Sequence, residues 1–475
     1  MSVKGALTTL VSRNSVTRFS CKFIHSRLRA SKTDVSILGQ PLTFRNGRTA
    51  PNRFLKAALT ERVSSWDVRD HSKRGIPEQG LVNLYEKWGN GQFGMILTGN
   101  VCVDTCNLES AGNVIFSKEN DSRELREMAT KISKAMKQDG ALAIAQISHA
   151  GRQTPEVVNP HPFSCSDIQL KAKRRFMGFG KPIALTEEQI KAEVIDRFVF
   201  AAKFAHDHGF DGVQIHGAHG YLLSSFMSPT TNNRTDKYGG AVENRMRVIR
   251  EIYEAIRKEI TASAGFLIGL KTNSVEFQDR GLGIEDAKAV CRMVEESGFD
   301  FVELSGGTIE KPAFQHMRDS TRKREAFFLE FAEKIRPCFD KTVVYLTGGF
   351  RTAPAMVEAV VEGTTDGVGL GRPATAEPDL PAKILRGDCL SAADANIDQD
   401  DYMLTATASN TQMWQMGKRP LAELKSICDD IADLSHPTEA ENFKKAAVLY
   451  YNQMKEIADR GGAIHGVMTY ENVIS

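Results

Sequence analysis

The sequence predicts an α/β protein made of one (β/α)8 TIM barrel with a helical C-terminal extension. Strand-like apolar runs alternate with helix-like segments eight times between residues 37 and 386. A second observation is a repeated junction, in which a glycine ends a helix and an aspartate precedes the next strand, at 209–213, 298–302 and 363–368. A doubly wound open sheet would show the same alternation and is the alternative fold.

The eight strands are expected where short apolar runs end in polar residues or glycine. In chain order they cover residues 54–59, 94–99, 142–147, 212–216, 266–271, 301–305, 343–347 and 367–370. Glycines 367, 369 and 371 in the last of these runs lack the spacing of a dinucleotide-binding fingerprint, and no second half-domain follows them. This absence favours the barrel over the open sheet.

The connecting segments show helical periodicity and recognisable ends. Thr186 and Gln189 have the spacing of a capping box, and Gly209 ends the helix that they begin. The long, proline-punctuated stretch 151–185 is expected to be a functional loop. The remaining helices are expected at 78–91, 122–138, 243–259, 284–297, 324–336 and 353–362.

Residues 387–475 are expected to form the helical extension after the barrel, which itself spans 37–386. A short helix at 379–385 should close the barrel, and two more are expected at 420–432 and 439–457. The extension contains no glycine-rich loop and no set of cysteine ligands. We therefore expect it to pack on the barrel or to build the interface of a homo-oligomer.

The overall composition is that of a soluble globular protein, with 41% hydrophobic and 25% charged residues. No run of about 18 apolar residues occurs, so no membrane span is expected. The eight cysteines are scattered without a Cys-x-x-Cys pair, and no metal site is expected. Beyond the basic leader the chain is slightly acidic, which argues against nucleic acid as a partner.

Residues 1–33 differ from the rest of the chain. They contain seven lysines and arginines, several serines and threonines, and no acidic residue before Asp34. Such a leader is typical of a mitochondrial transit peptide, which would place the protein in the mitochondrial matrix. The alternative is a disordered basic tail on a cytoplasmic protein.

The end of the fourth predicted strand carries the strongest chemical signal. His216, His219 and Tyr221 follow one another within six residues, separated by glycines that turn the backbone away from the strand. Two imidazoles beside a phenol can bind a polarised oxygen and donate a proton. In a barrel of this kind, catalytic residues lie at the carboxyl ends of the strands.

The last three strand ends carry glycines and an arginine, a combination suited to a phosphate. Backbone N–H groups at Ser305-Gly306-Gly307, Gly348-Gly349 and Gly371, together with Arg372, would cradle the anion. Earlier strand ends offer hydroxyl, amide and cationic groups around the same mouth, at Thr60, Gly99, Gln146 and Lys271. This pattern predicts a barrel that holds a phosphorylated heterocycle beside a polar substrate.

Several runs of the chain resemble the old yellow enzyme family of FMN-dependent oxidoreductases. The resemblance covers roughly 37–386, and its most specific part is HGAHGYLLSSFMSPTTNNRTDKYGGAVENR at 216–245. The runs NRFLKAALT, AQISHAGR, LTGGFR and GVGLGRP also match. The family implies a (β/α)8 barrel that binds FMN, oxidises NADPH or NADH, and reduces the carbon–carbon double bond of an α,β-unsaturated carbonyl or nitro compound. The expected small-molecule substrate is thus an enone, a nitro compound or a quinone.

The resemblance also implies roles for individual residues. His216 and His219 would hydrogen-bond the substrate oxygen, and Tyr221 would supply the proton. Lys271 takes the place of the cation near flavin N1 and O2, and Gln146 that of the amide at the pyrimidine edge. The remaining residues implied to bind the cofactor are Ala57, Ala58, Leu59, Thr60, Gly99, Gly348, Gly349, Gly371 and Arg372.

The sequence departs from the family pattern at a few of these positions. Ala58 and Leu59 stand where many members have proline and methionine, and Lys271 stands where many have arginine. These departures leave open a catalytically inactive flavin- or ligand-binding barrel that acts as an interaction protein. A third alternative is another kind of enzyme on a phosphate-binding barrel, such as a lyase that forms a Schiff base through Lys271. The cysteines after the barrel are too sparse for the iron–sulfur cluster of the family's larger members.

Overall fold

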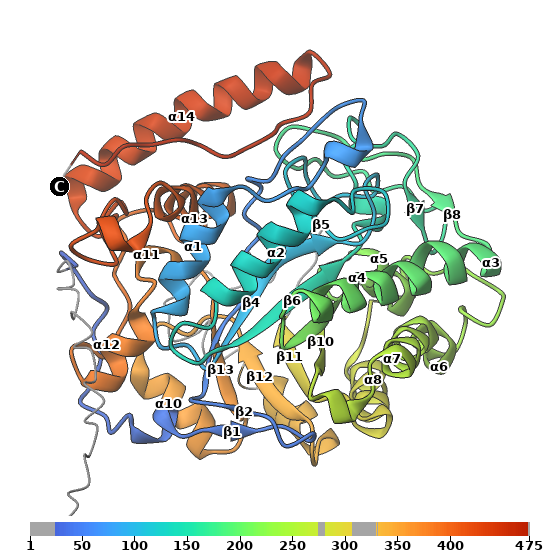
Figure 1. The fold of residues 1–475 in the computed structure, drawn as a ribbon, viewed down its shortest axis with the longest axis horizontal. Helices are drawn as coiled ribbons and strands as arrows, with labels where there is room; N and C mark the ends of the chain where they lie inside the picture. Colours follow the sequence, from blue (N-terminus) through green and yellow to red (C-terminus); the bar gives the residue numbers. More distant parts are fainter. Residues whose placement is uncertain (1–23, 274–280, 306–328, 330, 474–475) are drawn as a thin grey trace, which may run out of the picture.

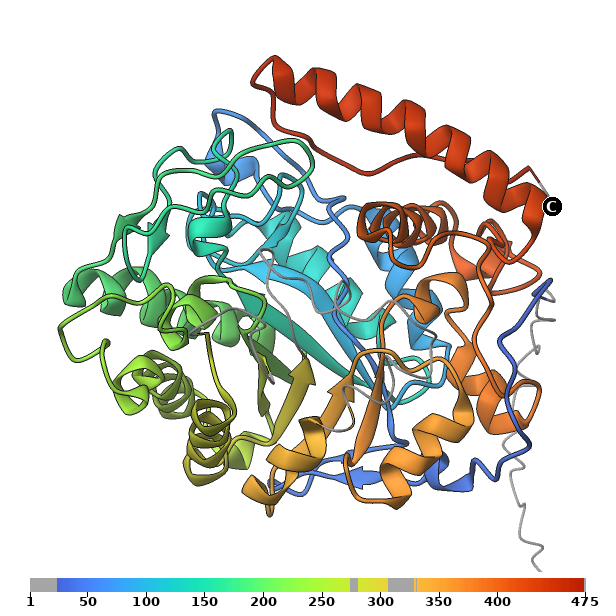
Figure 2. The ribbon, with the colours of Figure 1, turned by 180° about the vertical axis from the view of Figure 1, so that it is seen from behind.

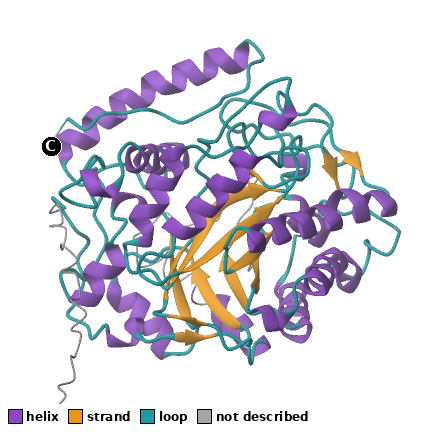
Figure 3. Cartoon of the chain, in the orientation of Figure 1, coloured by secondary structure: helices purple, strands orange, loops and turns teal. Residues whose placement is uncertain are grey.

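A computed structural model describes residues 24–273, 281–305, 329 and 331–473 of the chain. Its centre is a closed parallel barrel surrounded by helices (Figures 1 and 3). Each barrel strand pairs in parallel with the next, and the last pairs with the first. The open-sheet alternative is therefore wrong. The strands are β3 (Phe54–Lys56), β4 (Met95–Cys102), β6 (Leu142–Ser148), β9 (Gly212–Gly217), β10 (Leu267–Asn273), β11 (Phe301–Ser305), β12 (Val343–Thr347) and β13 (Gly367–Leu370).

The lower half of the barrel interior is a compact apolar layer. Alternate residues of a strand point inward, because successive side chains lie on opposite faces. Glycine makes room for the large aromatic rings: a Cβ atom at Gly269 would lie 2.2 Å from the ring of Phe301, and one at Gly367 would lie 2.5 Å from Tyr345. The other members of this layer are Leu55, Met95, Leu97, Leu142, Ile144, Leu267 and Val343.

A hairpin closes the amino-terminal end of the barrel. Its strands are β1 (Leu42–Thr43) and β2 (Thr49–Ala50), which pair antiparallel. Leu42, Phe44 and Ala50 join the apolar layer inside the barrel, and Phe44 packs edge-on against Phe301 with ring centroids 6.2 Å apart. With this end sealed, the opposite end is left for chemistry. Polar side chains accordingly gather at the carboxyl ends of the strands.

The surrounding helices follow the predicted alternation. Ser122 caps one helix by accepting the Leu125 N–H at 3.2 Å, and Thr186 and Gln189 form the predicted capping box. Of the helix expected at 324–336, residues 324–328 and 330 lie outside the described range, and the described residues 331–335 are helical. The outer helices are α1 (Gln79–Gly89), α2 (Arg123–Ala135), α3 (Glu187–Gln189) continuing through a π turn into α4 (Asp196–Asp207), α6 (Val242–Arg245), α7 (Arg247–Glu259), α8 (Ile284–Ser297), α10 (Ala353–Val361) and α12 (Leu380–Arg386).

The extension is helical, but one of its predicted helices is wrong. Residues 420–432 form only a 3-10 turn, Leu421–Glu423, followed by turns. The Asp429 carboxylate accepts the N–H groups of Lys425 and Ser426, and Asp430 has a φ of 68°. Such local side-chain bonds compete with helix formation. The helices observed instead are α13 (Tyr402–Gly417) and α14 (Pro437–Asp459), and the second confirms the helix expected at 439–457.

The extension packs directly on the barrel. Helix α13 crosses α1 closely, because a Cβ atom at Gly417 would lie only 2.8 Å from the Gly80 carbonyl oxygen. Buried Lys87 of α1 donates to the carbonyls of Met416 and Arg419 at 2.6 Å each. Helix α14 lies along the outer edge, on the side of the molecule opposite the β1–β2 hairpin (Figures 1 and 2).

The segment 24–28, which belongs to the predicted leader, runs beside the extension. Arg27 forms an antiparallel bridge with Ala393, and its guanidinium pairs with the fully buried Glu377 at 2.6 Å. The Ser26 N–H donates to Ser435 Oγ at 3.0 Å. Part of the predicted leader is thus attached to the folded protein, while residues 1–23 lie outside the described range. Among the described helices, none is long and apolar enough to cross a membrane.

Candidate active site at the mouth of the barrel

The two histidines lie against each other at the end of β9. His216 Nε2 and His219 Nδ1 are 3.2 Å apart, and the two rings meet edge to face. His219 has a φ of 61°, and its N–H donates to Asn273 Oδ1 at 3.1 Å. The left-handed backbone at His219 brings the second imidazole back over the first. Non-glycine residues adopt this conformation rarely, and it is often found at functional sites.

Polar residues of neighbouring strands hold both rings. His216 Nδ1 lies 3.0 Å from Asn100 Oδ1 and 3.3 Å from Ser148 Oγ. His219 Nε2 lies 3.1 Å from Ser305 Oγ. Ser305 is one of the predicted strand-end residues, whereas Asn100 and Ser148 were not predicted. All three occupy the last or near-last positions of barrel strands, and that position is the signal that could also have indicated Asn100 and Ser148.

Both imidazoles are neutral at physiological pH. Burial, followed by the positive charge of Lys271, lowers the pKa of His219 to about 3. Burial and the neighbouring His219 lower the pKa of His216 well below its ordinary value. A neutral imidazole carries one N–H donor. The pair can therefore donate hydrogen bonds to an oxygen without placing a full positive charge on either ring.

Tyr221 precedes helix α5 (Leu222–Met227), and its ring packs on His216 with centroids 4.9 Å apart. The residue is 8% exposed. Burial and then the nearby Glu109 carboxylate raise the pKa of the phenol above its ordinary value. The phenol therefore holds its proton at neutral pH. A protonated phenol beside two neutral imidazoles can donate a proton next to a pair of N–H groups that can bind an oxygen.

A buried polar layer crosses the barrel below the histidines. Gln146 Nε2 donates to Gln214 Oε1 at 2.6 Å, and Gln214 Nε2 donates to Glu303 Oε2 at 2.8 Å. Lys271 Nζ donates to Glu303 Oε1 at 2.9 Å. The structure connects the predicted Gln146 and Lys271 through Gln214 and Glu303, which were not predicted. Each of these two is a polar residue at an inward position of an otherwise apolar strand, Gln214 two residues before His216 and Glu303 two residues before Ser305. That pattern is the signal that could have indicated them.

The residues predicted for a phosphate also come together, at the adjacent ends of β12 and β13. Gly348 and Gly349 have φ values of 140° and 84°, which favour glycine. A Cβ atom at Gly371 would meet no nearer atom than Leu59 Cδ2 at 3.8 Å, so the backbone there is open. Half-buried Arg372 follows and begins helix α11 (Pro373–Ala376). Gly306 and Gly307, the other predicted members, lie outside the described residues.

The end of β3 lies on the other side of β13. Ala57 N–H donates to the Leu370 carbonyl at 2.9 Å, which ties this strand end to the phosphate-type residues. Ala58, Leu59 and Thr60 follow at the mouth, and the Thr60 carbonyl accepts a hydrogen bond from Asn410 of α13 at 2.8 Å. The extension thus supports this edge of the site.

Gly99 has a clear packing role in addition to its predicted one. Its N–H donates to Glu61 Oε1 and to the Tyr85 hydroxyl, both at 3.0 Å. A Cβ atom at this position would lie 2.1 Å from Glu61 Oε2. The close approach of Glu61 therefore requires glycine, and the Gly99 N–H is engaged below the mouth. Its contact with a cofactor stays a prediction.

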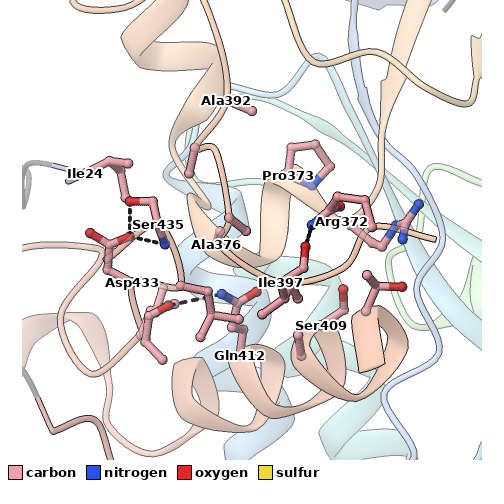
Figure 4. A pocket seen from close by; sticks show the side chains of 18 of the residues that line it. Ile24, Arg372, Pro373, Ala376, Ala392, Ile397, Ser409, Gln412, Asp433 and Ser435 are labelled. Atoms are coloured by element: carbon pink, nitrogen blue, oxygen red, sulfur yellow. Dashed lines mark hydrogen bonds between the residues drawn. The ribbon is translucent and has the colours of Figure 1, made fainter. Parts of the chain in front are cut away.

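A cavity of about 70 Å³ lies on the extension side of Arg372, between α11, α13 and the segment 24–28. In Figure 4, Asp433 and Ser435 occupy the side opposite Arg372, whose guanidinium points away from them. The cavity is lined mainly by alanine and other apolar side chains and is too small for a flavin. It is separate from the histidine pair, which belongs to the mouth of the barrel.

Comparison with known proteins gives a consistent result. The family described as "NADH:flavin oxidoreductase / NADH oxidase family" matches residues 38–389. The NADH-dependent flavin oxidoreductase nadA of Aspergillus parasiticus is 44% identical over 392 residues, which cover 81% of this chain and 87% of that protein. The NADH-dependent flavin oxidoreductase iliE of Hypocrea jecorina is 31% identical over 375 residues, covering 75% and 91%.

Solved structures share the fold at lower identity. A 2-naphthoyl-CoA reductase superposes with a TM-score of 0.69 at 22% identity, over 81% of this chain and 58% of that chain. The old yellow enzyme from Trypanosoma cruzi superposes with a TM-score of 0.62 at 22% identity, over 76% and 94%. At this level of identity the likeness concerns the fold.

The closed barrel has a histidine pair and glycine-rich strand ends at one mouth, and its match to a flavin oxidoreductase family identifies it as a flavin-dependent oxidoreductase. The chain belongs to the NADH:flavin oxidoreductase / NADH oxidase family, which includes the old yellow enzymes. It is an NAD(P)H-dependent FMN oxidoreductase.

The residues at the mouth are suited to FMN. Thr347 Oγ1 and Asn273 Nδ2 are buried polar atoms without a hydrogen-bond partner in the described part of the chain. Both lie at strand ends facing the mouth, where a polar ligand would satisfy them. The open backbone at Gly371 and the left-handed glycines of β12 leave room for a phosphate. Lys271 and the amide of Gln146 provide polar groups for the edge of a ring.

Proposed function

We propose that this flavin oxidoreductase reduces the activated carbon–carbon double bond of an α,β-unsaturated carbonyl or nitro compound, or reduces a quinone. The observation that carries the proposal is the pair of neutral, mutually bonded imidazoles beside a buried, protonated phenol. An oxygen acceptor that bonds to both rings would take over the contact between His216 Nε2 and His219 Nδ1. The substrate is therefore a molecule with a polarised oxygen conjugated to its double bond.

The protein residues then have distinct tasks. FMN supplies the hydride chemistry when it is bound at the mouth. His216 and His219 hold the substrate oxygen and stabilise the negative charge that develops on it. Tyr221 gives its proton to the α-carbon. In balance, the double bond gains a hydride at the β-carbon and a proton at the α-carbon, and the nicotinamide is oxidised.

The cofactor-facing residues complete the proposal. We place Gln146 and Lys271 at the pyrimidine edge of FMN, with Thr60 nearby, and the phosphate at Gly349, Gly371 and Arg372. The remaining backbone at Ala57–Leu59, Gly99 and Gly348 lines the ring and the ribityl chain. NADH is the proposed reductant, because the relatives from A. parasiticus and H. jecorina are both named NADH-dependent flavin oxidoreductases.

Anaerobic spectroscopy followed by turnover tests this function. The purified protein should be yellow, and stoichiometric NADH should bleach the flavin absorbance faster than NADPH does. Addition of an enone should restore the absorbance and yield the saturated product. A protein that binds FMN and accepts hydride but reduces no enone, nitroalkene or quinone would contradict the proposed activity. That outcome would favour the inactive, interaction-type barrel.

We also propose that the basic leader directs the protein to mitochondria. The support is the run of seven bases without an acid in residues 1–33. A fluorescent protein fused after residue 33 should colocalise with a mitochondrial dye. The same fusion with Arg13 and Arg18 changed to glutamate should stay in the cytoplasm, and equal distribution of both fusions would disprove the proposal.

A further inference from the structure

Glu303 occupies a central position in the buried polar layer of the barrel. It is fully buried, and its two carboxylate oxygens accept different donors: Oε1 accepts Lys271 Nζ at 2.9 Å and Oε2 accepts Gln214 Nε2 at 2.8 Å. It stands in the middle of β11, two positions before Ser305, so that both point into the barrel. Glu303 lies below the mouth and is connected to it by hydrogen bonds through Gln214 and Lys271.

A carboxylate in this position determines the direction of the hydrogen-bond chain. It can only accept, so Gln214 must turn its NH2 group toward Glu303 and its carbonyl oxygen toward Gln146. Gln146 must then use an N–H of its own NH2 group to reach Gln214, at 2.6 Å. The carbonyl oxygen of Gln146 is left outside the chain, where it can accept a hydrogen bond from a ligand.

The same carboxylate sets the charge of the layer. Lys271 is 4% exposed, and the Glu303 carboxylate is its ion-pair partner at 2.9 Å. The two opposite charges offset each other, although the charge of Lys271 also helps to lower the pKa of His219. A bare ammonium at this depth would favour the reduced, anionic form of a flavin much more strongly than a neutral pair does.

We propose that Glu303 is a positioning residue for FMN, which orients the Gln146 amide through Gln214 and lowers the flavin reduction potential by neutralising Lys271. The proposal rests on the placement of Gln146 and Lys271 at the pyrimidine edge of FMN, as set out under the proposed function. It adds a residue that touches neither the flavin nor the substrate.

The midpoint potential of bound FMN in Glu303→Gln tests the proposal. The substitution keeps the size of the side chain, leaves Lys271 without its counter-charge and allows the chain direction to reverse. The affinity for reduced FMN relative to oxidised FMN should rise by about tenfold or more, which corresponds to about 30 mV more positive for a two-electron couple. FMN affinity, measured by fluorescence quenching, should fall because Gln146 loses its fixed orientation. An unchanged potential in a folded, flavin-bound Glu303→Gln protein would overturn the proposal.

Two further variants separate charge from general disturbance. Lys271→Gln combined with Glu303→Gln removes both charges and should return the potential close to that of the wild type. Glu303→Asp keeps the negative charge, so its flavin potential should equal that of the wild type. This measurement also tests the proposal if Glu303→Gln is too unstable to purify. A potential raised equally in Glu303→Asp would show that the carboxylate charge is not the cause.

Glu377 provides a matched control elsewhere in the chain. It is also fully buried and also pairs with a lysine, Lys383 at 2.8 Å, but it lies between the barrel and the extension. Glu377→Gln should lower thermal stability and leave the potential unchanged. An equal shift in both variants would contradict a specific role for Glu303. Since the readout needs no alkene substrate, its result is independent of whether enone reduction is observed.

Discussion

At the scale of single residues, the site depends on keeping its ionisable groups uncharged. The imidazoles of His216 and His219 and the phenol of Tyr221 are all buried, and burial is the largest cause of the pKa shift in each. Desolvation always disfavours the charged form, so it lowers the pKa of histidine and raises that of tyrosine. The two shifts together give neutral donors across the physiological pH range.

Tyr221→Phe should separate the two half-reactions. Loss of the phenolic proton should slow alkene reduction by about 100-fold or more, the usual range for a general acid. Reduction of the flavin by NADH should change by less than about twofold, because Tyr221 is assigned no part in that step. Stopped-flow absorbance measures both rates. Equal losses in the two half-reactions would remove Tyr221 from the proton-donor role.

The low pKa of His219 has a consequence for stability. Between its folded pKa of about 3 and its ordinary value of 6.5, the unfolded chain binds more protons than the folded one. Stability should therefore be present above about pH 6.5 and decline as the pH falls, by up to about 1.4 kcal/mol per pH unit from this one group. His219→Asn cannot bind that proton.

Urea unfolding of wild type and His219→Asn at pH 7.5, 6.5, 5.5 and 4.5 tests this effect. The wild type should lose stability more steeply than the variant below pH 6.5, and the two should run parallel above it. Parallel curves over the whole range would mean that His219 titrates alike in the folded and unfolded states.

At the scale of elements, the segment 24–28 stabilises the fold through contacts with residues far away in the sequence. Arg27 satisfies the buried Glu377 carboxylate, and hydrogen bonds tie the segment to residues 391–394 and 433–435. Hydrogen bonds to charged groups contribute about 1.5–3 kcal/mol each when buried. The segment should accordingly be needed for full stability.

Two truncated proteins test this role. Removal of residues 1–23 should leave the melting temperature near that of the full chain, whereas removal of 1–33 should lower the free energy of unfolding by about 2 kcal/mol or more. Arg27→Ala in the full chain should reproduce most of that loss. Equal stability of the two truncated proteins would show that the contacts of Arg27 contribute nothing measurable.

The elements also show where sequence reasoning was accurate and where it was not. Barrel strands and their helices carry clear apolar periodicity, so their order and the gathering of Gln146, His216, Tyr221 and Lys271 at one mouth could be predicted. Helix α13 could not be predicted, because threonine, serine and glutamine on its buried face interrupt the apolar periodicity. Several of these buried polar side chains form hydrogen bonds with other segments of the chain. Gln214 and Glu303 were not predicted, because each is a single polar residue in an apolar strand and gives no repeating pattern in the sequence.

At the scale of the whole molecule, barrel and extension share one interior. Asn83 and Lys87 of α1 donate to carbonyls at the end of α13, and Asn410 of α13 donates to Thr60 at the mouth. Buried donors that cross the boundary would be left without partners if either part opened alone, at a cost of about 1–3 kcal/mol each. The extension is thus part of the cooperative structure around the site.

We therefore expect one thermal unfolding transition for the holoenzyme. Trp88 of α1 and Trp414 of α13 report on the two parts, so variants that retain one or the other tryptophan allow each to be followed by fluorescence. Both signals, far-UV circular dichroism and flavin release should share one midpoint. An earlier transition seen only through Trp414 would indicate an extension that unfolds independently.

The left-handed backbone at His219 limits how this enzyme can be altered. A residue at this position must tolerate a φ near 61°, which branched and bulky side chains do only under strain. A saturation library at position 219 should thus yield folded, flavin-containing protein mainly for histidine, asparagine, aspartate and glycine. Among these, only histidine and asparagine offer a neutral side-chain N–H to a substrate oxygen.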